Sequence, residues 1–313
     1  MQVFRSTATR NKNPLALTIG NFDGVHLGHQ AILERLKQAA NRLQLSACIM
    51  IFEPHPREFL TPNQSPTRLT SLREKLEIFA ELGIDRVQIC HFNHSFAQIS
   101  AQSFITDILL KQLNVRWLLV GDDFRFGAKR MGDVSLLKAH SQQANQFEVE
   151  VMADFSINHI RVSSTAIREA LSAGNMVLAQ QLLGRPYSMS GRIVNGEKLA
   201  KQLGFPTANI HFKHNRPPLQ GIFAVEVISR ASSKLPKVMQ GVASLGVRPT
   251  THNSNKLILE VHLFDFDQEI YGQHLQVNFL HKLRDEEKYA DLETLIEQIK
   301  QDIINAKNYF RLH

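Results

Sequence analysis

The chain has very little cysteine, with Cys48 and Cys90 as the two examples in 313 residues. Both lie in apolar, strand-like runs, where a thiol usually serves as a small buried hydrophobic group. Two such residues give no support to a disulfide framework or a zinc site. The hydrophobic content of 43% and the charged content of 21% are those of an ordinary globular protein.

Long apolar runs are absent as well. No window of the sequence approaches the roughly 20 apolar residues that a helix needs to cross a bilayer. Residues 1–13 lack the apolar core of a signal peptide, and the chain has no internal repeat or low-complexity tract. We therefore expect a cytoplasmic protein that does not bind membranes.

The sequence also lacks a block of consecutive Lys and Arg residues. The net charge is +7 and the sequence pI is near 9.5, which suits anionic partners. Because the basic residues are spread along the chain, we expect small phosphorylated molecules as partners and no nucleic acid.

The length predicts two domains, because 313 residues exceed the size at which a single hydrophobic core usually stops growing. Helical patterning ends and β patterning begins within residues 184–191, which contain Gly and Pro. We predict one domain over residues 1–184 and a second over residues 185–313.

The first half alternates β-prone runs with amphipathic helical patterns, which predicts a parallel α/β sheet. The expected strands are 15–19, 47–52, 86–90, 117–120 and 149–152, and the expected helices lie near 28–43, 70–82, 101–113 and 133–144. Ligands collect beyond the carboxyl ends of the strands in such sheets. The residues directly after each strand are therefore the candidates for chemistry.

The first of these junctions is GNFDGVHLGH, residues 20–29. Its three glycines allow a tight turn and a close approach of the backbone to a ligand. The first turn of the following helix presents unpaired N–H groups, and His26 and His29 add further donors there. A lone histidine would be an ordinary turn residue, but this combination predicts a phosphate site.

Three further junctions carry unusual residues. Each has a structural alternative, since prolines can simply end a strand, aspartate can form a turn and hydroxyls can cap a helix. The last junction also places an arginine one turn after its hydroxyls, which suits a triphosphate. The candidates are Phe52, Pro54, His55 and Pro56 in FEPHPR, Asp123 and Phe124 in GDDFRFG, and Ser163, Ser164, Thr165 and Arg168 in RVSSTAIR.

The second half contains short β-prone runs with little helix between them, which predicts a small antiparallel sheet or barrel. These runs are 189–194, 208–212, 223–228, 238–245, 257–264 and 275–279, and a helix is expected over 291–304. Thr207 and Asn209 in LGFPTAN place two hard oxygen donors on one face if the segment is extended. They are either ordinary turn groups or ligands of a Mg²⁺ ion that already carries nucleotide phosphates and needs only one or two protein oxygens. Glu260 lies inside an expected strand and is either solvent-facing or a base that reaches a substrate hydroxyl.

These motifs resemble those of the bacterial bifunctional riboflavin kinase/FMN adenylyltransferases, or FAD synthetases, over nearly the whole chain. HLGH and SSTAIR are similar to phosphate signatures of the nucleotidyltransferase superfamily, and LGFPTAN and LEVHLFDFDQEIYG are similar to kinase motifs. The resemblance implies an N-terminal Rossmann-like nucleotidyltransferase sheet and a C-terminal antiparallel riboflavin kinase barrel with a C-terminal helix. It also implies two Mg²⁺–ATP-dependent steps, from riboflavin to FMN and from FMN to FAD.

The resemblance further implies individual roles. The catalytic residues would be His26, His29, Arg168 and Glu260, and the magnesium ligands would be Thr207 and Asn209. ATP would contact Gly20, Asn21, Gly28, Ser163, Ser164, Thr165, Lys201, Thr207 and Asn209. The flavin would contact Phe52, Pro54, His55, Pro56, Asp123, Phe124 and Arg284.

Some positions depart from the family pattern. Many bacterial kinases carry a Gly-Arg pair before LGFPTAN, where this chain has Leu199, Ala200 and Lys201. Lysine supplies a point charge instead of the arginine fork, so we expect an effect on ATP affinity in the kinase half. Ser244 also stands where Asn is frequent. A nucleotidyltransferase for another acceptor, similar to pantetheine-phosphate adenylyltransferase, is the enzymatic alternative, and LGFPTAN and Glu260 argue against it. A basic flavin- or nucleic-acid-binding regulator is the non-enzymatic alternative, and it would bind oligonucleotides in a salt-sensitive way without turnover.

Overall fold

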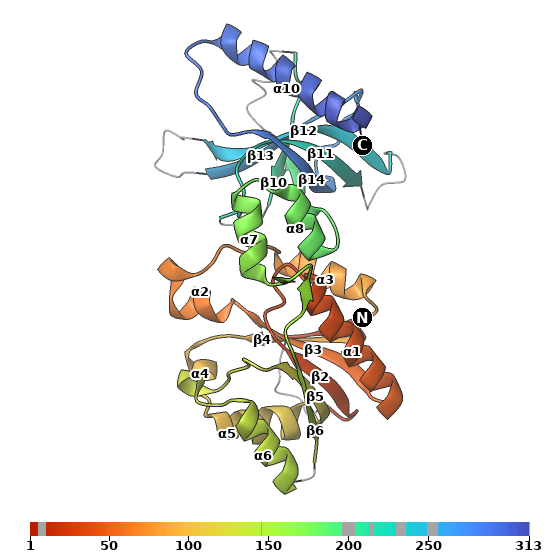
Figure 1. Ribbon diagram of the computed structural model, residues 1–313, viewed down its shortest axis with the longest axis vertical. Coiled ribbons are helices and arrows are strands. Elements are labelled where there is room, and N and C mark those ends of the chain that lie inside the picture. Colours follow the sequence, from red (N-terminus) through yellow and green to blue (C-terminus); the bar gives the residue numbers. More distant parts are fainter. Residues whose placement is uncertain are drawn as a thin grey trace. The chain divides into compact units, whose positions relative to one another are not determined.

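The computed structural model describes residues 1–5, 11–144, 146–195, 204–212, 216–229, 236–248 and 256–312. The chain forms two compact units (Figure 1). The first unit comprises Met1–Pro66 and Leu72–Ser163, and the second comprises Thr67–Ser71 and Ser164–His313. Lys201, with its neighbours Leu199 and Ala200, lies outside the described residues.

The first unit is built on a six-stranded parallel sheet in the order β1-β4-β3-β2-β5-β6. Its strands are β1 (Gln2–Phe4), β2 (Leu15–Ile19), β3 (Ser46–Glu53), β4 (Arg86–His91), β5 (Val115–Gly121) and β6 (Glu148–Met152). The central strands are apolar at nearly every position because both faces of the sheet are covered, as parallel sheets require.

Alternate residues of β2 show how the two faces are buried. Leu15 and Leu17 pack in one core cluster with the helical segment Phe104–Gln112 and with Leu137 of α6 (Val134–Ala144). Ala16 packs in the other cluster with α1 (Leu27–Leu43) and α3 (Leu72–Glu81). Figure 1 shows α1 and α6 on opposite sides of the sheet.

Short elements complete the first unit. They are α2 (Pro56–Leu60), η1 (Pro62–Gln64), α4 (His94–Ala97), α5 (Ala101–Ser103), η3 (Ala128–Arg130) and the two-stranded hairpin of β7 (Ser156–Ile157) and β8 (Ile160–Arg161). The helix expected over 101–113 is one turn of α-helix followed by π-helix, η2 (Phe104–Gln112). Hydrophobic periodicity predicts a helix there but does not specify its hydrogen-bond pattern.

The second unit is a closed antiparallel barrel in the order β10-β13-β12-β11-β14-β9. Its strands are β9 (Tyr187–Val194), β10 (Ala208–His211), β11 (Gly221–Ser229), β12 (Val238–Arg248), β13 (Lys256–Leu263) and β14 (His274–Arg284). Alternation along β13 buries Leu259 and Val261 against Leu245 and Ala243 of β12. Glu260, which lies between Leu259 and Val261, therefore faces the other side of this sheet.

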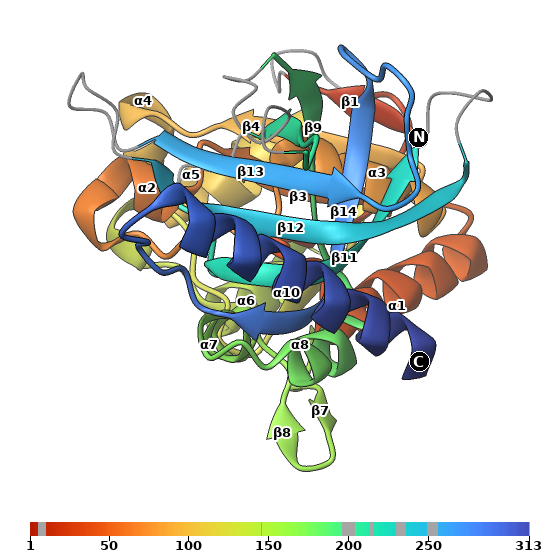
Figure 2. The same ribbon diagram turned by 90° about the horizontal axis from the view of Figure 1, so that it is seen from above.

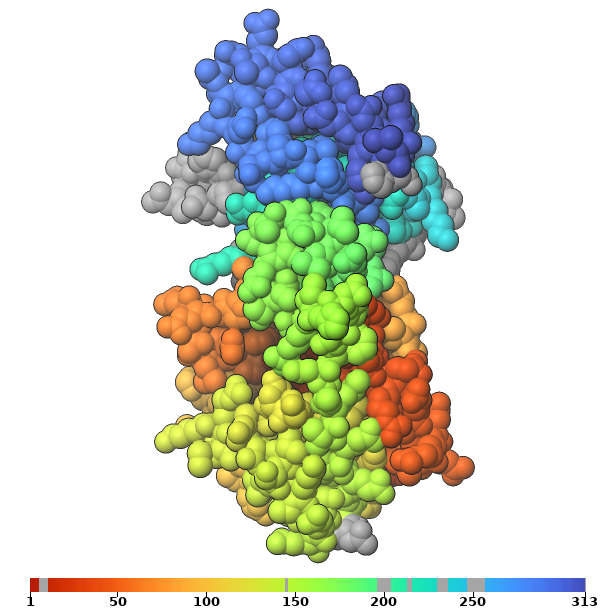
Figure 3. Space-filling view, in the orientation of Figure 1, coloured from red at the N-terminus to blue at the C-terminus, as the bar shows by residue number. Residues whose placement is uncertain are grey.

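Helices cover parts of the barrel. The pair α7 (Ser164–Ser172) and α8 (Met176–Leu183) precedes β9, and α8 contacts β9 and β14. The terminal helix α10 (Leu292–Leu312) contacts β11, β12 and β14, and Figure 2 shows it crossing the strands. In the space-filling view α10 forms part of the outer surface (dark blue in Figure 3), with Leu312 80% exposed.

The compact units divide twenty residues before the predicted boundary at Gly184, because α7 and α8 are grouped with the barrel. Spatial grouping does not test where one activity ends and the other begins. The boundary near Gly184 stays a prediction, and so do the domains 1–184 and 185–313.

Candidate nucleotide and flavin sites

Three of the predicted site motifs follow neighbouring strands of the parallel sheet. The HLGH loop follows β2, FEPHPR follows β3 and GDDFRFG follows β5, and β2 pairs directly with both β3 and β5. Because parallel strands end at the same edge, the three loops emerge side by side. The first unit therefore presents its candidate residues at one edge of the sheet.

Apolar anchors hold the loop between β2 and α1. Phe22 is 2% exposed and Val25 is fully buried, and both adopt left-handed backbone angles with φ of 48° and 40°. Such angles cost free energy in non-glycine residues, so core packing of the two side chains must hold them in place. Gly24, in the same loop, also has a positive φ of 81°, which glycine adopts without a steric cost.

His26 and His29 lie at the start of α1. His26 is the N-cap residue, and its Nδ1 accepts a hydrogen bond of 3.3 Å from the backbone N–H of His29. A neutral imidazole that accepts at Nδ1 carries its proton on Nε2, which leaves Nε2–H as the donor. The two rings stack at a centroid distance of 3.6 Å. Gly28 belongs to the same turn, where a Cβ would lie 3.3 Å from the His26 ring.

Lys75 of α3 supports this loop, and the sequence analysis did not identify it. Lys75 is only 6% exposed, and its Nζ donates a 2.6 Å hydrogen bond to the backbone oxygen of Asn21. Lysine is rarely buried without a specific partner. The side-chain Oδ1 of Asn21 is buried and has no hydrogen-bond partner among the described residues. The signal available in the sequence was the helical spacing, since Lys75 lies four residues before Phe79 on the buried face of α3.

The FEPHPR segment ends β3 and starts α2. Glu53–Pro54 is a cis peptide bond. His55 caps α2, because its Nδ1 accepts from the Arg57 N–H at 3.1 Å while its own N–H donates to Glu58. His55 thus has a structural role at its Nδ1. Phe52 makes edge-to-face contacts with Phe92 and Phe96, at centroid distances of 6.1 and 5.6 Å.

Asp123 and Phe124 follow the end of β5 in a tight turn. The N–H of Phe124 donates to the oxygen of Gly121 at 3.2 Å, and the Phe124 ring stacks on Phe126 at 5.5 Å. Phe52 and Phe124 pack against the same core cluster of the sheet. An aromatic layer therefore lies beneath two of the segments that the sequence assigns to the flavin.

The SSTAIR segment is divided by the two compact units, with Ser163 in the first and Ser164, Thr165 and Arg168 in the second. Ser164 begins α7, as the capping pattern predicts. Arg168 donates from Nε to the backbone oxygen of Thr67 at 2.6 Å, so part of its guanidinium holds the Thr67–Ser71 segment.

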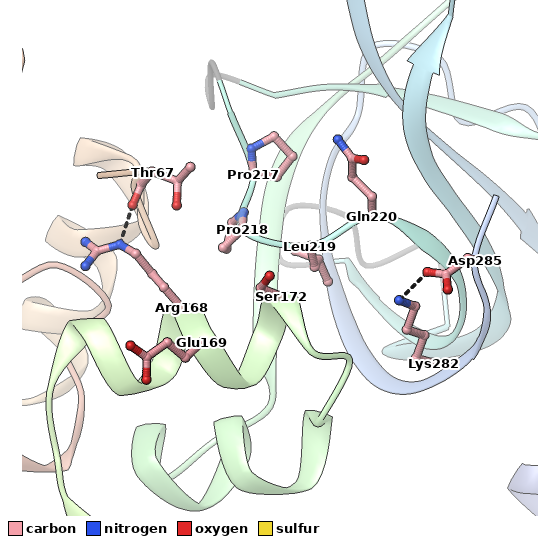
Figure 4. A pocket seen from close by; sticks show the side chains of 10 residues that line it. All are labelled: Thr67, Arg168, Glu169, Ser172, Pro217, Pro218, Leu219, Gln220, Lys282 and Asp285. Carbon is pink, nitrogen blue, oxygen red and sulfur yellow. Dashed lines mark hydrogen bonds and ion pairs between the residues drawn. The ribbon is translucent and has the colours of Figure 1, made fainter. Parts of the chain in front are cut away.

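A pocket of about 560 Å³ lies within the second unit. Arg168, Glu169 and Ser172 come from α7, the segment Pro217–Gln220 contributes a second wall, and Lys282 and Asp285 close the far side (Figure 4). Its charges are partly paired, since Lys282 forms a 2.6 Å ion pair with the 84% exposed Asp285. The pocket thus presents two cations and two carboxylates to the same space.

Two of the predicted kinase residues, Asn209 and Glu260, lie in one cross-strand row of the barrel. Asn209 of β10 pairs with Glu260 of β13, and Glu260 pairs on its other side with Ser244 of β12. Directly paired antiparallel residues point to the same face of a sheet. Thr207 stands just before β10. The barrel therefore brings together three residues that lie far apart in the sequence.

Glu286 joins this row, and the sequence analysis missed it. The Ser244 hydroxyl lies 3.4 Å from its Oε1, and its carboxylate lies against Gly246, where any Cβ would overlap it. Gly246 thus allows the carboxylate to lie directly on β12. Glu286 follows β14 by two residues, in a segment where the sequence drew attention to Arg284 alone.

Arg284 makes a buried ion pair with α10. Its Nε and Nη2 donate to the two carboxylate oxygens of Asp302 at 2.9 and 2.7 Å, and its Nη1 donates to the Asp285 oxygen at 2.9 Å. Burial alone would lower the pKa of the Arg284 guanidinium, but the Asp302 carboxylate raises it above its usual value. Arg284 therefore anchors the end of β14, and its contact with flavin stays a prediction.

Among the described residues, no group of three or more His, Cys, Asp or Glu side chains could hold a metal ion. Magnesium that arrives with nucleotide phosphates needs only one or two protein oxygens, so the Thr207 and Asn209 pair fits such an ion. In the part of the chain that is described, no helix has both the length and the apolar character to cross a bilayer.

A six-stranded parallel sheet followed by a closed antiparallel barrel, each carrying one of the predicted phosphate motifs, is the architecture expected of a two-domain ATP-dependent transferase. Residues 8–166 match the FAD synthetase family, and residues 183–310 match the riboflavin kinase family. The chain belongs to the bifunctional riboflavin kinase/FMN adenylyltransferase family. This confirms the resemblance, the expected domain order and the fold class.

Similar proteins span nearly the whole chain. The bifunctional riboflavin kinase/FMN adenylyltransferase of Escherichia coli K12 is 44% identical, covering 95% of this chain and 93% of that protein. The enzyme of the same name from Haemophilus influenzae is 43% identical over 99% of both chains, and that of Pseudomonas fluorescens is 46% identical over 93% and 91%.

A solved structure from Streptococcus pneumoniae has the same fold. It covers 98% of both chains with a TM-score of 0.81 and 26% sequence identity, and its title describes a macrolide-efflux protein. That title applies to the pneumococcal protein.

Proposed function

We propose that this chain converts riboflavin to FMN and FMN to FAD, using ATP in both steps. The observation that carries the proposal is that one chain holds two separate sets of predicted phosphate-binding residues. One set lies at the edge of a parallel sheet, and the other lies in a cross-strand row of a barrel. Family membership over the full chain supports the same two activities.

The kinase step takes place in the barrel. The Glu260 carboxylate accepts the proton of the terminal riboflavin hydroxyl, whose oxygen attacks the γ-phosphorus of ATP. The bond between the γ-phosphorus and the bridging oxygen breaks, which gives FMN and ADP. Thr207 and Asn209 supply oxygen atoms that would hold a magnesium ion bound to the nucleotide phosphates, and magnesium would neutralise charge there.

The adenylyl transfer step needs no protein nucleophile. A phosphate oxygen of FMN attacks the α-phosphorus of ATP, and pyrophosphate leaves. His26 and His29 donate hydrogen bonds to the phosphates beside the N–H groups of α1, and Gly20, Asn21 and Gly28 let the backbone approach. Phosphate contacts of Ser163, Ser164, Thr165 and Arg168 are predictions that rest on the SSTAIR sequence.

The flavin contacts are also proposals. Phe52 and Phe124 offer aromatic surfaces, while Pro54, His55, Pro56 and Asp123 shape the loops around them. We propose a cytoplasmic location on the basis of composition. We propose magnesium as the cation of the kinase step on the basis of the Thr207 and Asn209 oxygens, and as the cation of the adenylyl transfer step on the basis of the family resemblance.

The experiment that tests the function separates the two steps. Purified protein is incubated with riboflavin, ATP and Mg²⁺, and the flavins are separated by chromatography. We expect FMN and FAD from the wild type. His29→Ala should slow FAD formation from supplied FMN by about 10²–10³-fold and leave FMN formation intact.

Asn209→Ala is the matching change in the barrel, and it should abolish FMN formation while FAD still forms from supplied FMN. If each substitution disabled both steps in a folded protein, the assignment of one step to each site would be wrong.

A further inference from the structure

We propose that His262 is a positioning residue for the kinase step, because it anchors the segment that carries Thr207 and leads into Asn209 of β10. This inference rests on the proposed kinase function and adds a residue to it. His262 does not occupy a place in the cross-strand row itself. It acts on the row through the Phe205–Pro206 segment.

The anchoring contact is a hydrogen bond. Nδ1 of His262 lies 2.9 Å from the backbone oxygen of Pro206. A carbonyl oxygen only accepts, so Nδ1 must be the donor and must carry a proton. The Pro206 carbonyl belongs to the peptide unit that leads directly into Thr207. Fixing this carbonyl therefore fixes the peptide plane from which Thr207 extends.

Ring packing reinforces the bond. The Phe205 ring meets the His262 ring edge to face at a centroid distance of 6.1 Å, and Phe264, just after β13, meets it at the same distance. Phe264 in turn contacts Phe310 of α10 at 6.3 Å. The imidazole thus contacts two aromatic rings in addition to the Pro206 carbonyl.

Strand geometry links the anchor to the proposed base. His262 and Glu260 are two residues apart on β13, so their side chains leave the same face of the strand. Asn209 pairs with Glu260 across β10 and β13. One strand therefore sets the position of the base and, through His262, the position of the turn just before Asn209.

The reaction is sensitive to this placement. Catalytic groups must be held within a fraction of an ångström, and an error of about 1 Å can cost about 10²-fold in rate. Residues that hydrogen-bond to the ligand-bearing segment do this by fixing its orientation. Since Thr207 and Asn209 would hold the magnesium ion of Mg–ATP, losing the anchor should affect the nucleotide more than the flavin.

The test compares two substitutions of His262 in the full chain. His262→Phe keeps an aromatic ring between Phe205 and Phe264 but has no donor. His262→Asn loses the ring but places its Nδ2 near the position of the histidine Nδ1. We expect His262→Phe to raise the KM for Mg–ATP about five- to tenfold, with less than a twofold change in the KM for riboflavin. His262→Asn should restore the KM for Mg–ATP to within about threefold of wild type.

Two controls accompany these variants. His281→Phe alters another barrel histidine, whose ring stacks on Tyr309 at 5.0 Å, and it should leave the KM for Mg–ATP unchanged. FAD formation from supplied FMN should stay at the wild-type rate in every variant, which shows that the first unit is intact. A KM for riboflavin within twofold of wild type shows that the barrel is folded.

The outcomes separate the two proposals. Absence of FMN formation by the wild type would overturn the kinase function itself. With an active wild type, equal KM values for Mg–ATP in wild type and His262→Phe would overturn the positioning role. Equal impairment of His262→Phe and His262→Asn would show that a restored donor does not restore the KM for Mg–ATP, which also overturns the positioning role.

A measurement on the wild type covers the case in which His262→Phe fails to fold. Nitrogen-15 NMR of the imidazoles distinguishes a protonated from an unprotonated Nδ1, and the His262 signal is assigned by its loss in His262→Asn. We expect a protonated Nδ1 at neutral pH. An unprotonated Nδ1 would refute the hydrogen bond to Pro206.

Discussion

Removing the carboxylate of Asp302 should destabilise the barrel unit strongly. The Asp302 side chain is 5% exposed and the Arg284 side chain 18%, and two hydrogen bonds of 2.9 and 2.7 Å join them. Gln298 donates a third at 3.0 Å. Asp302→Ala would leave a mostly buried guanidinium without its counter-ion, at the point where β14 meets α10.

The size of the effect follows from the burial. Removing one partner of a buried ion pair costs about 3–5 kcal/mol, because the remaining charge stays desolvated. For a folding unit of this size, 1 kcal/mol corresponds to a change in Tm of about 2–4 °C. We therefore expect the transition of the barrel unit to fall by about 6–20 °C.

Differential scanning calorimetry measures this transition, with Glu297→Gln as the matched control. Glu297 lies on the same helix and pairs with Lys300 at 3.2 Å, but the two side chains are 74% and 54% exposed. Exposed pairs contribute about 0–1 kcal/mol, so its Tm should hardly move. If Asp302→Ala unfolded at the same temperature as Glu297→Gln, the reasoning from burial would be refuted.

Three further substitutions or treatments test other parts of the molecule. Glu260→Gln should lower kcat for FMN formation by about 10²–10⁴-fold with FAD formation from FMN unchanged, and an active Glu260→Gln would exclude Glu260 as the base. Lys75→Met removes the 2.6 Å bond to Asn21, so FAD formation should fall about tenfold or more, and unchanged kinetics would show that the loop needs no such support. Burial raises the pKa of Cys48 and of Cys90 to about 12 from 9.0, so iodoacetamide at pH 8 should label neither thiol until urea is added. Because the pKa of each thiol is higher in the folded than in the unfolded chain, the stability that the buried, protonated thiols contribute is complete below pH 9 and is lost between pH 9 and about 12. Rapid labelling of the native protein would contradict the burial of the two thiols.

The local elements of the fold could be predicted well. The strand expected over 15–19 is β2 (Leu15–Ile19), and the helix expected over 28–43 is α1 (Leu27–Leu43). The helix expected over 291–304 continues to Leu312. Such features depend on periodicity and capping within one segment, which the sequence displays directly.

The position of the site motifs could also be predicted, because parallel sheets place their loops at the carboxyl edge. The residues that hold these motifs in place through hydrogen bonds could not be predicted. Lys75 is separated from Asn21 by 54 positions, and Glu286 from Ser244 by 42. No local pattern distinguishes these residues from the other charged residues of a helix or a turn.

By itself, the sequence determined that an α/β half precedes a β half, and it identified the motifs that belong to the two activities, because each depends on residues close together in the chain. The tertiary structure decided how the barrel closes, which places Asn209 opposite Glu260 and directs Arg284 to Asp302. Those pairings depend on strand register and on burial between distant segments, and both arise only when the chain packs.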